Sequence, residues 1–325
     1  RKLIMLKDFE IKRWHLIACI SAITLVMVIL ILASTEIKTQ DSDEYITFIK
    51  YLIGIDNIKL FWIHSSIYPL ICSLFMRIYP SIKVIQLFGV AILFLIGFMI
   101  WQFTKSKKAV LLWAFSPIVW MLAGSITPAI PGALLFLAAY IFLKKYEEKQ
   151  NRNILLLSGL MIWLSNAVTE ASWPYSLFFI LVFFYKKGFK EMLQFSVAAI
   201  IGFATKLVAD YFIFGYAHFS LLRFIGANFV VFIGQHSGNI IYQFYLRNIL
   251  IIIFGISPLL FLAYKQYKKE LKAEYIFVSI SLLFMLIIYT SGMPHHFFSI
   301  VPIAIILISK VFSKASGILF LILPP

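Results

Sequence analysis

Apolar runs of about 20 residues recur along this chain, beginning with residues 14–34. A helix of that length crosses the roughly 30 Å hydrocarbon core of a bilayer. Hydrophobic residues make up 62% of the sequence and charged residues only 13%, whereas soluble domains carry about 25% charged residues. These features predict an all-α, polytopic protein of the lipid bilayer. The first run is too long for a cleavable signal peptide and lacks a small-residue cleavage pattern, so we expect it to be a span.

The basic residues predict the orientation of the spans. The net charge is +15, but the positive residues lie in short clusters between the apolar runs, so we expect no nucleic-acid partner. Six clusters hold 21 of the 29 Lys and Arg residues: 1–13, 105–108, 144–152, 186–190, 265–272 and 310–314. The positive-inside rule places all of them on the cytoplasmic face of a multi-pass plasma-membrane protein. Cys19 and Cys72 both lie in apolar segments, so a disulfide framework is not expected.

With these clusters inside, the whole chain 1–325 forms one transmembrane domain of about 10–11 helices. The expected spans are about 14–34, 84–103, 109–125, 132–143, 153–169, 172–185, 191–213, 246–264, 273–290 and 297–309, with an eleventh beginning at 315. Spans 2–7 thus fill 84–213, and spans 8–11 fill 246–325. Residues 35–83 form a long external loop, and 214–245 an external or re-entrant segment.

Two helices are expected within the external loop. The segment 65–80 is apolar, but a span there would move the later basic clusters outside, so we expect a helix along the interface. An amphipathic helix is expected near 45–53.

Three carboxylates, Asp41, Asp43 and Glu44, open this loop. Carboxylates favour helix N-termini, so one interpretation is that they cap the helix near 45–53. A carboxylate in a cavity can instead act as a general base, and like charges beside it raise its pKa. The Asp-x-Asp spacing also suits a divalent cation such as Mg²⁺ or Mn²⁺, which ranks second.

Further polar residues are candidates for the same external site. Arg223 and Arg247 could contact a phosphate or extend to the interface. For the adjacent His295 and His296, a phosphate contact, a metal pair and simple exposure all stay open. Glu170 lies near the outer end of 153–169, where it would face the same cavity as Asp43.

Lys206 and Asp210 stand four residues apart in the expected span 191–213, so they share a helix face and can pair. A charge inside a span is a candidate for function. A structural ion pair fits equally well.

The order of these segments resembles the GT-C glycosyltransferases, membrane enzymes that use polyprenyl-phosphate sugars. DSDEYITFIKYLIG, then HSSIYPLICSLFMRIYPS, then a span ending WQFTKSKK resemble the start of that superfamily, and its dolichyl-phosphate-mannose protein mannosyltransferase-like (family 39-like) branch looks closest. Later segments agree in order: SPIVWMLAGSITPAIPGALLFLAAYIFLKK, LLLSGLMIWLSNAVTEASWPYSLFFIL and SGMPHHFFSIVPIAII.

The resemblance implies a GT-C-like helical bundle and a transferase. Asp43 fills the family's acidic position and would be the general base that activates an acceptor hydroxyl, with inversion at the sugar. Asp41 and Glu44 would position the acceptor, which is a glycan, a lipid or a protein. The leaving polyprenyl phosphate would meet cationic partners among Arg223, Arg247, His295, His296 and Lys206, with Glu170 as a further substrate contact.

Two other functions stay open. A transporter or lipid flippase could use Lys206 and Asp210 to relay ions, although the sequence shows no internal repeat. A non-catalytic subunit is the other alternative, because GSITPAIPG, in the second external loop, lacks the acid that many relatives have there.

Overall fold

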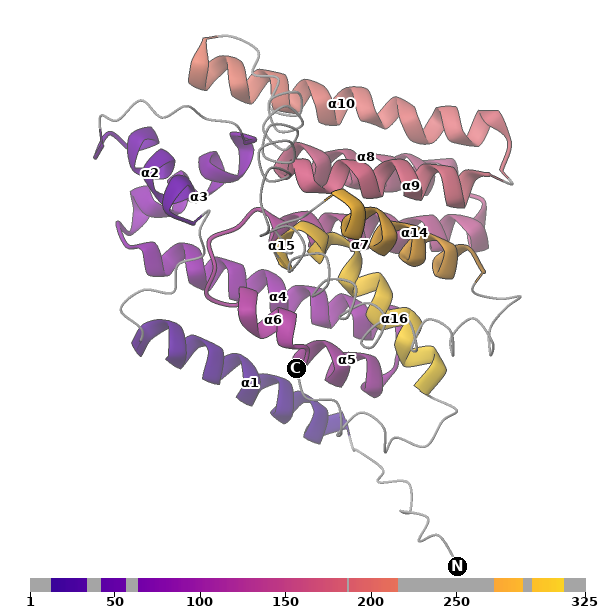
Figure 1. Ribbon diagram of the computed structural model, residues 1–325, viewed down its shortest axis with the longest axis horizontal. Helices are drawn as coiled ribbons and strands as arrows, with labels where there is room; N and C mark the ends of the chain where they lie inside the picture. Colours follow the sequence, from indigo (N-terminus) through magenta and orange to yellow (C-terminus); the bar gives the residue numbers. More distant parts are fainter. Residues whose placement is uncertain are drawn as a thin grey trace, which may run out of the picture.

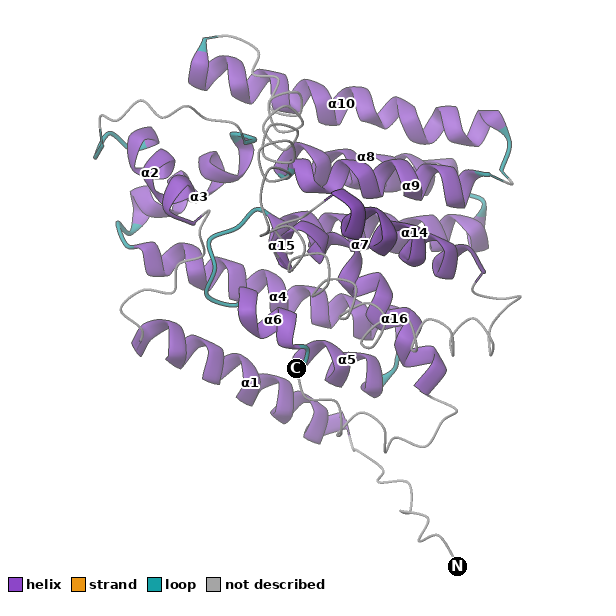
Figure 2. Ribbon diagram, in the orientation of Figure 1, coloured by secondary structure: helices purple, strands orange, loops and turns teal. Residues whose placement is uncertain are grey.

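The computed structural model describes residues 13–33, 42–56, 64–185, 187–215, 272–288 and 294–312. All regular structure in these residues is helical (Figure 2), which confirms the all-α prediction. The span expected at 246–264 and nearly all of the segment 214–245 lie outside the described residues.

Long helices lie side by side and form the body of the molecule (Figure 1). They are α1 (Arg13–Ala33), α4 (Ile82–Thr104), α7 (Ala129–Lys149), α8 (Arg152–Val168), α9 (Trp173–Phe184), α10 (Phe189–Phe214), α14 (Lys272–Ile288) and α16 (Val301–Phe312), and the short helices α5 (Lys107–Ala114) and α6 (Pro117–Leu122) pack with them. The elements between them are α2 (Ser42–Leu52), α3 (Ile67–Ile78), η1 (Glu170–Ser172), α15 (Pro294–Phe297) and η3 (Phe298–Ile300).

The loops gather at two opposite ends of this bundle (Figure 1). One end carries α2 and α3 together with 123–128, η1 and η3, and we call it the α2–α3 end. The other end carries the basic clusters at 105–108 and 144–152 and the residues 187–190 of a third cluster, and we call it the basic end. An ion pair of 3.0 Å between Lys187 Nζ and Glu147 Oε1 joins two of these clusters. The clusters that the positive-inside rule groups on one face are therefore neighbours in space.

Within the described residues, α4, α7 and α10 are each long and apolar enough to cross a bilayer. They cover the ranges expected for the second, fourth and seventh spans. α3 is only 12 residues long and lies with α2 at one end of the bundle, as expected for the loop helix at 65–80.

The segment expected as one span at 109–125 forms two helices, because the helix is interrupted just before Pro117. Proline has no backbone N–H and its ring crowds the preceding turn, so it is tolerated at the start of a helix but not inside one. Pro117 accordingly opens α6, with Ser116 as its N-cap. The indole N–H of Trp120 donates to the carbonyl of Ala114 at 2.8 Å and bridges the break.

Aromatic side chains fill the core between α7, α9, α10 and α14. The rings of Phe179 and Phe183 lie 4.7 Å apart, and those of Phe136 and Phe277 stack at 6.0 Å. Phe195 of α10 stacks on Phe179 at 6.1 Å. Such pairs stabilise by about 0.5–1.5 kcal/mol beyond their buried area.

Small residues let α8 and α10 approach closely. A Cβ atom on Gly159 would lie 2.2 Å from the carbonyl oxygen of Phe195, and one on Gly202 would lie 2.7 Å from the Cβ of Trp163. Glycine at such positions lets membrane helices pack backbone against backbone.

We therefore expect Gly159→Ala to lower the free energy of unfolding by about 1–3 kcal/mol, the usual cost of overpacking. The measurement is thermal unfolding of the detergent-solubilised protein. Gly89→Ala in α4 is the matched control, because its Cβ would lie 3.5 Å from Ile130 Cδ1, an ordinary contact. Equal unfolding temperatures for the two variants would contradict the close approach.

Candidate active site

The first turn of α2 is fixed to the loop between α6 and α7. The Ser42 hydroxyl accepts a hydrogen bond from the Ile126 N–H and donates to the Ile126 carbonyl, both at 3.3 Å. Ser42 and Tyr45 are buried, while Asp43 and Glu44 on the other side of the helix are exposed. The acids therefore stand at the α2–α3 end on a helix whose inner face is anchored.

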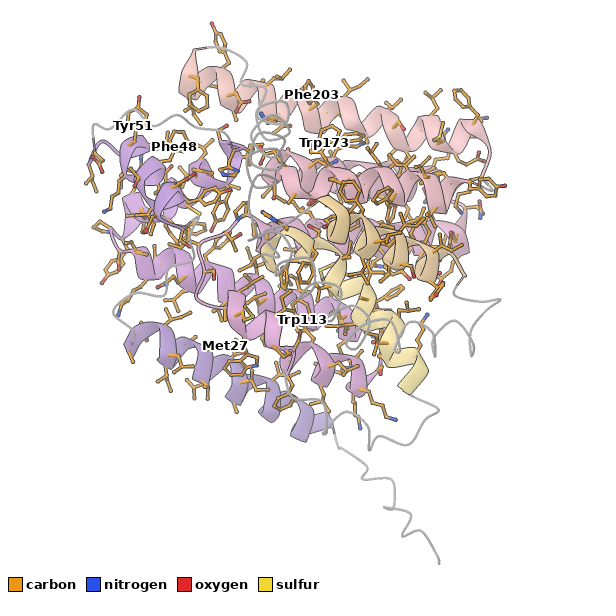
Figure 3. The ribbon with its side chains drawn as sticks, in the orientation of Figure 1. Met27, Phe48, Tyr51, Trp113, Trp173 and Phe203 are labelled. Atoms are coloured by element: carbon orange, nitrogen blue, oxygen red, sulfur yellow. The ribbon has the colours of Figure 1, made fainter. Side chains whose placement is uncertain are left out.

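α2 also contacts α10. The ring of Phe48 (labelled in Figure 3) stacks on that of Phe214 with the centroids 5.8 Å apart. The ring of Tyr51 (Figure 3) also stacks with that of Phe48, with the centroids 6.1 Å apart. The far end of α10 thus helps to hold the helix that carries the acids.

His64 lies beside these acids. Its Nε2 is 3.9 Å from Oε2 of Glu44, and its ring centroid is 5.4 Å from that of Tyr45. The His64 side chain is only 14% exposed, against 57% for Glu44. The distance is longer than a hydrogen bond but short enough for charge attraction when the imidazole is protonated. Sequence reasoning did not single out His64, although it opens the HSSIYPL motif.

Two serines after His64 attach this turn to the bundle. Ser65 donates a hydrogen bond to the Ala167 carbonyl of α8. Ser66 donates one to Oδ1 of Asp210 in α10. The other oxygen of Asp210, Oδ2, accepts from Lys206 Nζ at 2.5 Å. The ion pair expected from the four-residue spacing is present, and both of its members are buried.

Glu170 is buried in η1, at the same end as α2 and α3. Serines beside it link separate helices: Ser165 donates to the Gly132 carbonyl at 2.9 Å, and the hydroxyls of Ser172 and Ser299 lie 2.8 Å apart. This polar cluster joins α7, α8, η1 and η3. Glu170 therefore belongs to the structured interior of the α2–α3 end.

The remaining expected site residues divide into two groups. His296 is partly buried in α15, which packs beside η1 and η3 at this end. Asp41, Arg223, Arg247 and the side chain of His295 lie outside the described residues. Among the side chains that the structure describes, no three His, Cys, Asp or Glu residues gather closely enough to hold a metal ion.

The sequence matches no model of a protein family and no curated protein. Solved structures do match. The crystal structure of ArnT from Cupriavidus metallidurans bound to undecaprenyl phosphate superposes with a TM-score of 0.67 at 13% identity, covering 92% of this chain and 60% of that one. The apo form of the same protein gives a TM-score of 0.65 with the same identity and coverage.

The chain has the ArnT fold. ArnT has a polytopic GT-C membrane fold, so the GT-C-like bundle expected from the motifs is confirmed, and the chain is an integral membrane protein. The ArnT neighbours do not distinguish the mannosyltransferase-like branch, which stays a prediction. The chain spans about 60% of the length of the ArnT structures.

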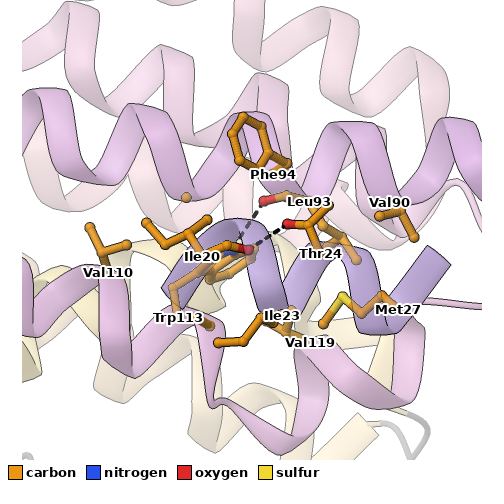
Figure 4. A pocket seen from close by; sticks show the side chains of 12 residues that line it. Ile20, Ile23, Thr24, Met27, Val90, Leu93, Phe94, Val110, Trp113 and Val119 are labelled. Carbon is orange, nitrogen blue, oxygen red and sulfur yellow. Dashed lines mark hydrogen bonds between the residues drawn. The ribbon is translucent and has the colours of Figure 1, made fainter. Parts of the chain in front are cut away.

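Within this ArnT-like bundle, one small cavity of about 30 Å³ lies between α1, α4 and α5 (Figure 4). Its polar groups are already satisfied, because Thr24 donates to the Ile20 carbonyl at 2.9 Å and the Trp113 indole donates to the Leu93 carbonyl at 3.0 Å. Apolar side chains such as Met27 line the rest. This space is a packing gap and not a polar site.

A larger cavity, of about 480 Å³, lies between α4 and α7 and includes Lys145 and Glu148 near the basic end. It contains none of the acids discussed above.

In α3, burial raises the pKa of the Cys72 thiol to about 12 and that of Tyr68 well above its usual value. Both groups therefore stay neutral at physiological pH and act as packing residues.

Proposed function

We propose that this chain is a membrane glycosyltransferase that moves a sugar from a polyprenyl-phosphate donor to an acceptor hydroxyl on the extracytoplasmic side. The observation that carries the proposal is the placement of Asp43, Glu44 and His64 together at one end of a bundle with the ArnT fold. A crystal structure of ArnT contains undecaprenyl phosphate, which supports a polyprenyl phosphate as the partner here.

Asp43 is the proposed general base. It is exposed on the first turn of α2, where an acceptor can reach it. The carboxylate takes the proton of the acceptor hydroxyl, and the acceptor oxygen attacks the anomeric carbon. The bond from that carbon to the phosphate oxygen breaks, and the polyprenyl phosphate leaves with the electron pair. A single displacement of this kind inverts the anomeric centre.

The other site residues are proposed as binding groups. Asp41 and Glu44 position the acceptor, which is a glycan, a lipid or a protein, and Glu170 contacts substrate from η1. Arg223, Arg247, His295 and His296 are the proposed supply of cations for the leaving phosphate. Lys206, expected in the same role, is buried in an ion pair with Asp210 and is not assigned to the phosphate. A divalent cation, Mg²⁺ or Mn²⁺, is the second choice after these cationic side chains as the partner of the leaving phosphate. A lipid monophosphate presents no diphosphate for a metal ion to neutralise.

The arrangement of the loops supports the extracytoplasmic placement. The basic clusters at 105–108 and 144–152 share the end opposite α2 and α3 with residues 187–190. If that end faces the cytoplasm, as the positive-inside rule requires, the acids face outward. A polyprenyl-phosphate head group in the outer leaflet would then meet them at the membrane surface.

The test is mass spectrometry of glycans and glycolipids from a strain lacking this gene, compared with its parent. We expect a sugar-bearing product to lose one sugar mass and to regain it when the wild-type chain is restored. An unchanged set of glycans and glycolipids would contradict the enzymatic proposal. Labelling of an introduced cysteine at position 43 from outside intact cells separately tests the orientation.

A further inference from the structure

The turn that carries His64 is held from α10, a helix distant from it in sequence. Ser66 is fully buried and donates a hydrogen bond to Oδ1 of Asp210, 144 residues further along the chain. Lys206 Nζ occupies the other oxygen of the same carboxylate at 2.5 Å. Each carboxylate oxygen of Asp210 thus has one partner, and the three side chains form a continuous buried chain of contacts.

Each of the three side chains, Lys206, Asp210 and Ser66, has a physical role in this contact. A buried carboxylate is costly unless it is paired, so Lys206 makes the Asp210 charge tolerable inside the bundle. A paired carboxylate in a low-dielectric setting is a strong and directional hydrogen-bond acceptor. The serine hydroxyl that reaches it is therefore held in one place.

That fixed point lies two residues from His64. The imidazole is mostly covered, packs 5.4 Å from the Tyr45 ring and places Nε2 3.9 Å from Glu44. α2 is itself attached to α10 through Phe48 and Phe214. The turn that carries His64 and the helix that carries Glu44 are thus both attached to the same end of α10.

We propose that Lys206, Asp210 and Ser66 form a clamp that sets the position of His64 against the acidic first turn of α2. They are positioning residues, because they act through the 64–66 turn. This role rests on the proposed glycosyltransferase function. It also gives the intramembrane charges a purpose that requires neither ion relay nor direct contact with the donor phosphate.

The first arm of the test measures how accessible position 64 is, and it does not depend on enzymatic activity. Ser66→Thr keeps the hydroxyl and Ser66→Val has the same shape without it, so the two variants share any packing cost. A cysteine replaces His64 in each background, and its labelling rate with a membrane-impermeant maleimide is measured. We expect labelling to be at least about tenfold faster with Val than with Thr, because the turn is released. A cysteine at Ile55, which is exposed on the same loop, is the control and should label equally in both.

The second arm measures function with His64 intact. We expect Ser66→Val to bind undecaprenyl phosphate within about twofold of Ser66→Thr but to transfer sugar about tenfold more slowly in native membranes. A general loss of folding would instead weaken binding and rate together.

The outcomes separate the clamp from the glycosyltransferase proposal. Equal labelling of position 64 in the Thr and Val backgrounds would overturn the clamp, whatever the activity. A change in labelling with no change in transfer, in a protein that Asp43→Asn inactivates, would overturn the positioning role. If Asp43→Asn leaves transfer intact, the glycosyltransferase site is wrong, and the labelling arm alone decides whether the clamp exists.

Discussion

Asp43→Asn is expected to lower the rate of sugar transfer by about 10²–10⁴-fold, the usual contribution of a general base. Asparagine has nearly the shape of aspartate but cannot accept the acceptor's proton. Because Asp43 is exposed and Ser42 and Tyr45 make the buried contacts of this turn, the substitution should leave the fold unchanged. Binding of undecaprenyl phosphate should also be retained, since the acid acts on the acceptor side.

The measurement is the initial rate of product formation in membranes, with expression level and thermal unfolding measured in parallel. Asp56→Asn is the matched control, because it removes a carboxylate from the other end of the same short segment. We expect that variant to retain most of its transfer activity. If Asp43→Asn keeps more than half of the wild-type rate, Asp43 is not the base. A transporter or flippase whose gate lies elsewhere would give that result.

Lys144→Met is expected to lower the free energy of unfolding by about 2–3 kcal/mol. Lys144 Nζ lies 2.7 Å from Glu274 Oε1, and the Glu274 side chain is only 5% exposed. The Tyr140 hydroxyl donates to the same oxygen at 3.1 Å. Removing Lys144 leaves the buried carboxylate without its cation, which costs about 3–5 kcal/mol for a fully buried pair. The expected value is lower because the Lys144 side chain is 22% exposed.

Lys145→Met is the control, because this neighbouring lysine is exposed and loses the same positive charge. Thermal unfolding in detergent should separate the two variants, with Lys144→Met unfolding first. Equal destabilisation by both would mean that the Lys144–Glu274 pair does not hold α14 to α7. Because this pair lies at the basic end, Lys144→Met protein that stays folded should retain its transfer rate.

Much of this fold could be predicted from sequence, because helix formation in a membrane depends on local composition. Apolar length alone located α4, α7 and α10, and the requirement to keep the basic clusters on one face predicted a separate short helix at 65–80, where α3 lies. The Lys206–Asp210 pair followed from helical spacing. The segment expected as one span at 109–125 is two helices, α5 and α6, and the signal for the break, Pro117, was in the sequence.

The sequence by itself determined the all-helical fold class, the positions of most helices and the loop, 35–83, in which to seek the acids. Only the tertiary structure brought His64 to Glu44, Ser66 to Asp210 and Lys144 to Glu274. The last two of these contacts join residues more than 100 positions apart, and neither periodicity nor charge pattern relates such positions. They form because burying a charge or a hydroxyl among packed helices requires a partner, and which partner is within reach depends on how the helices are arranged.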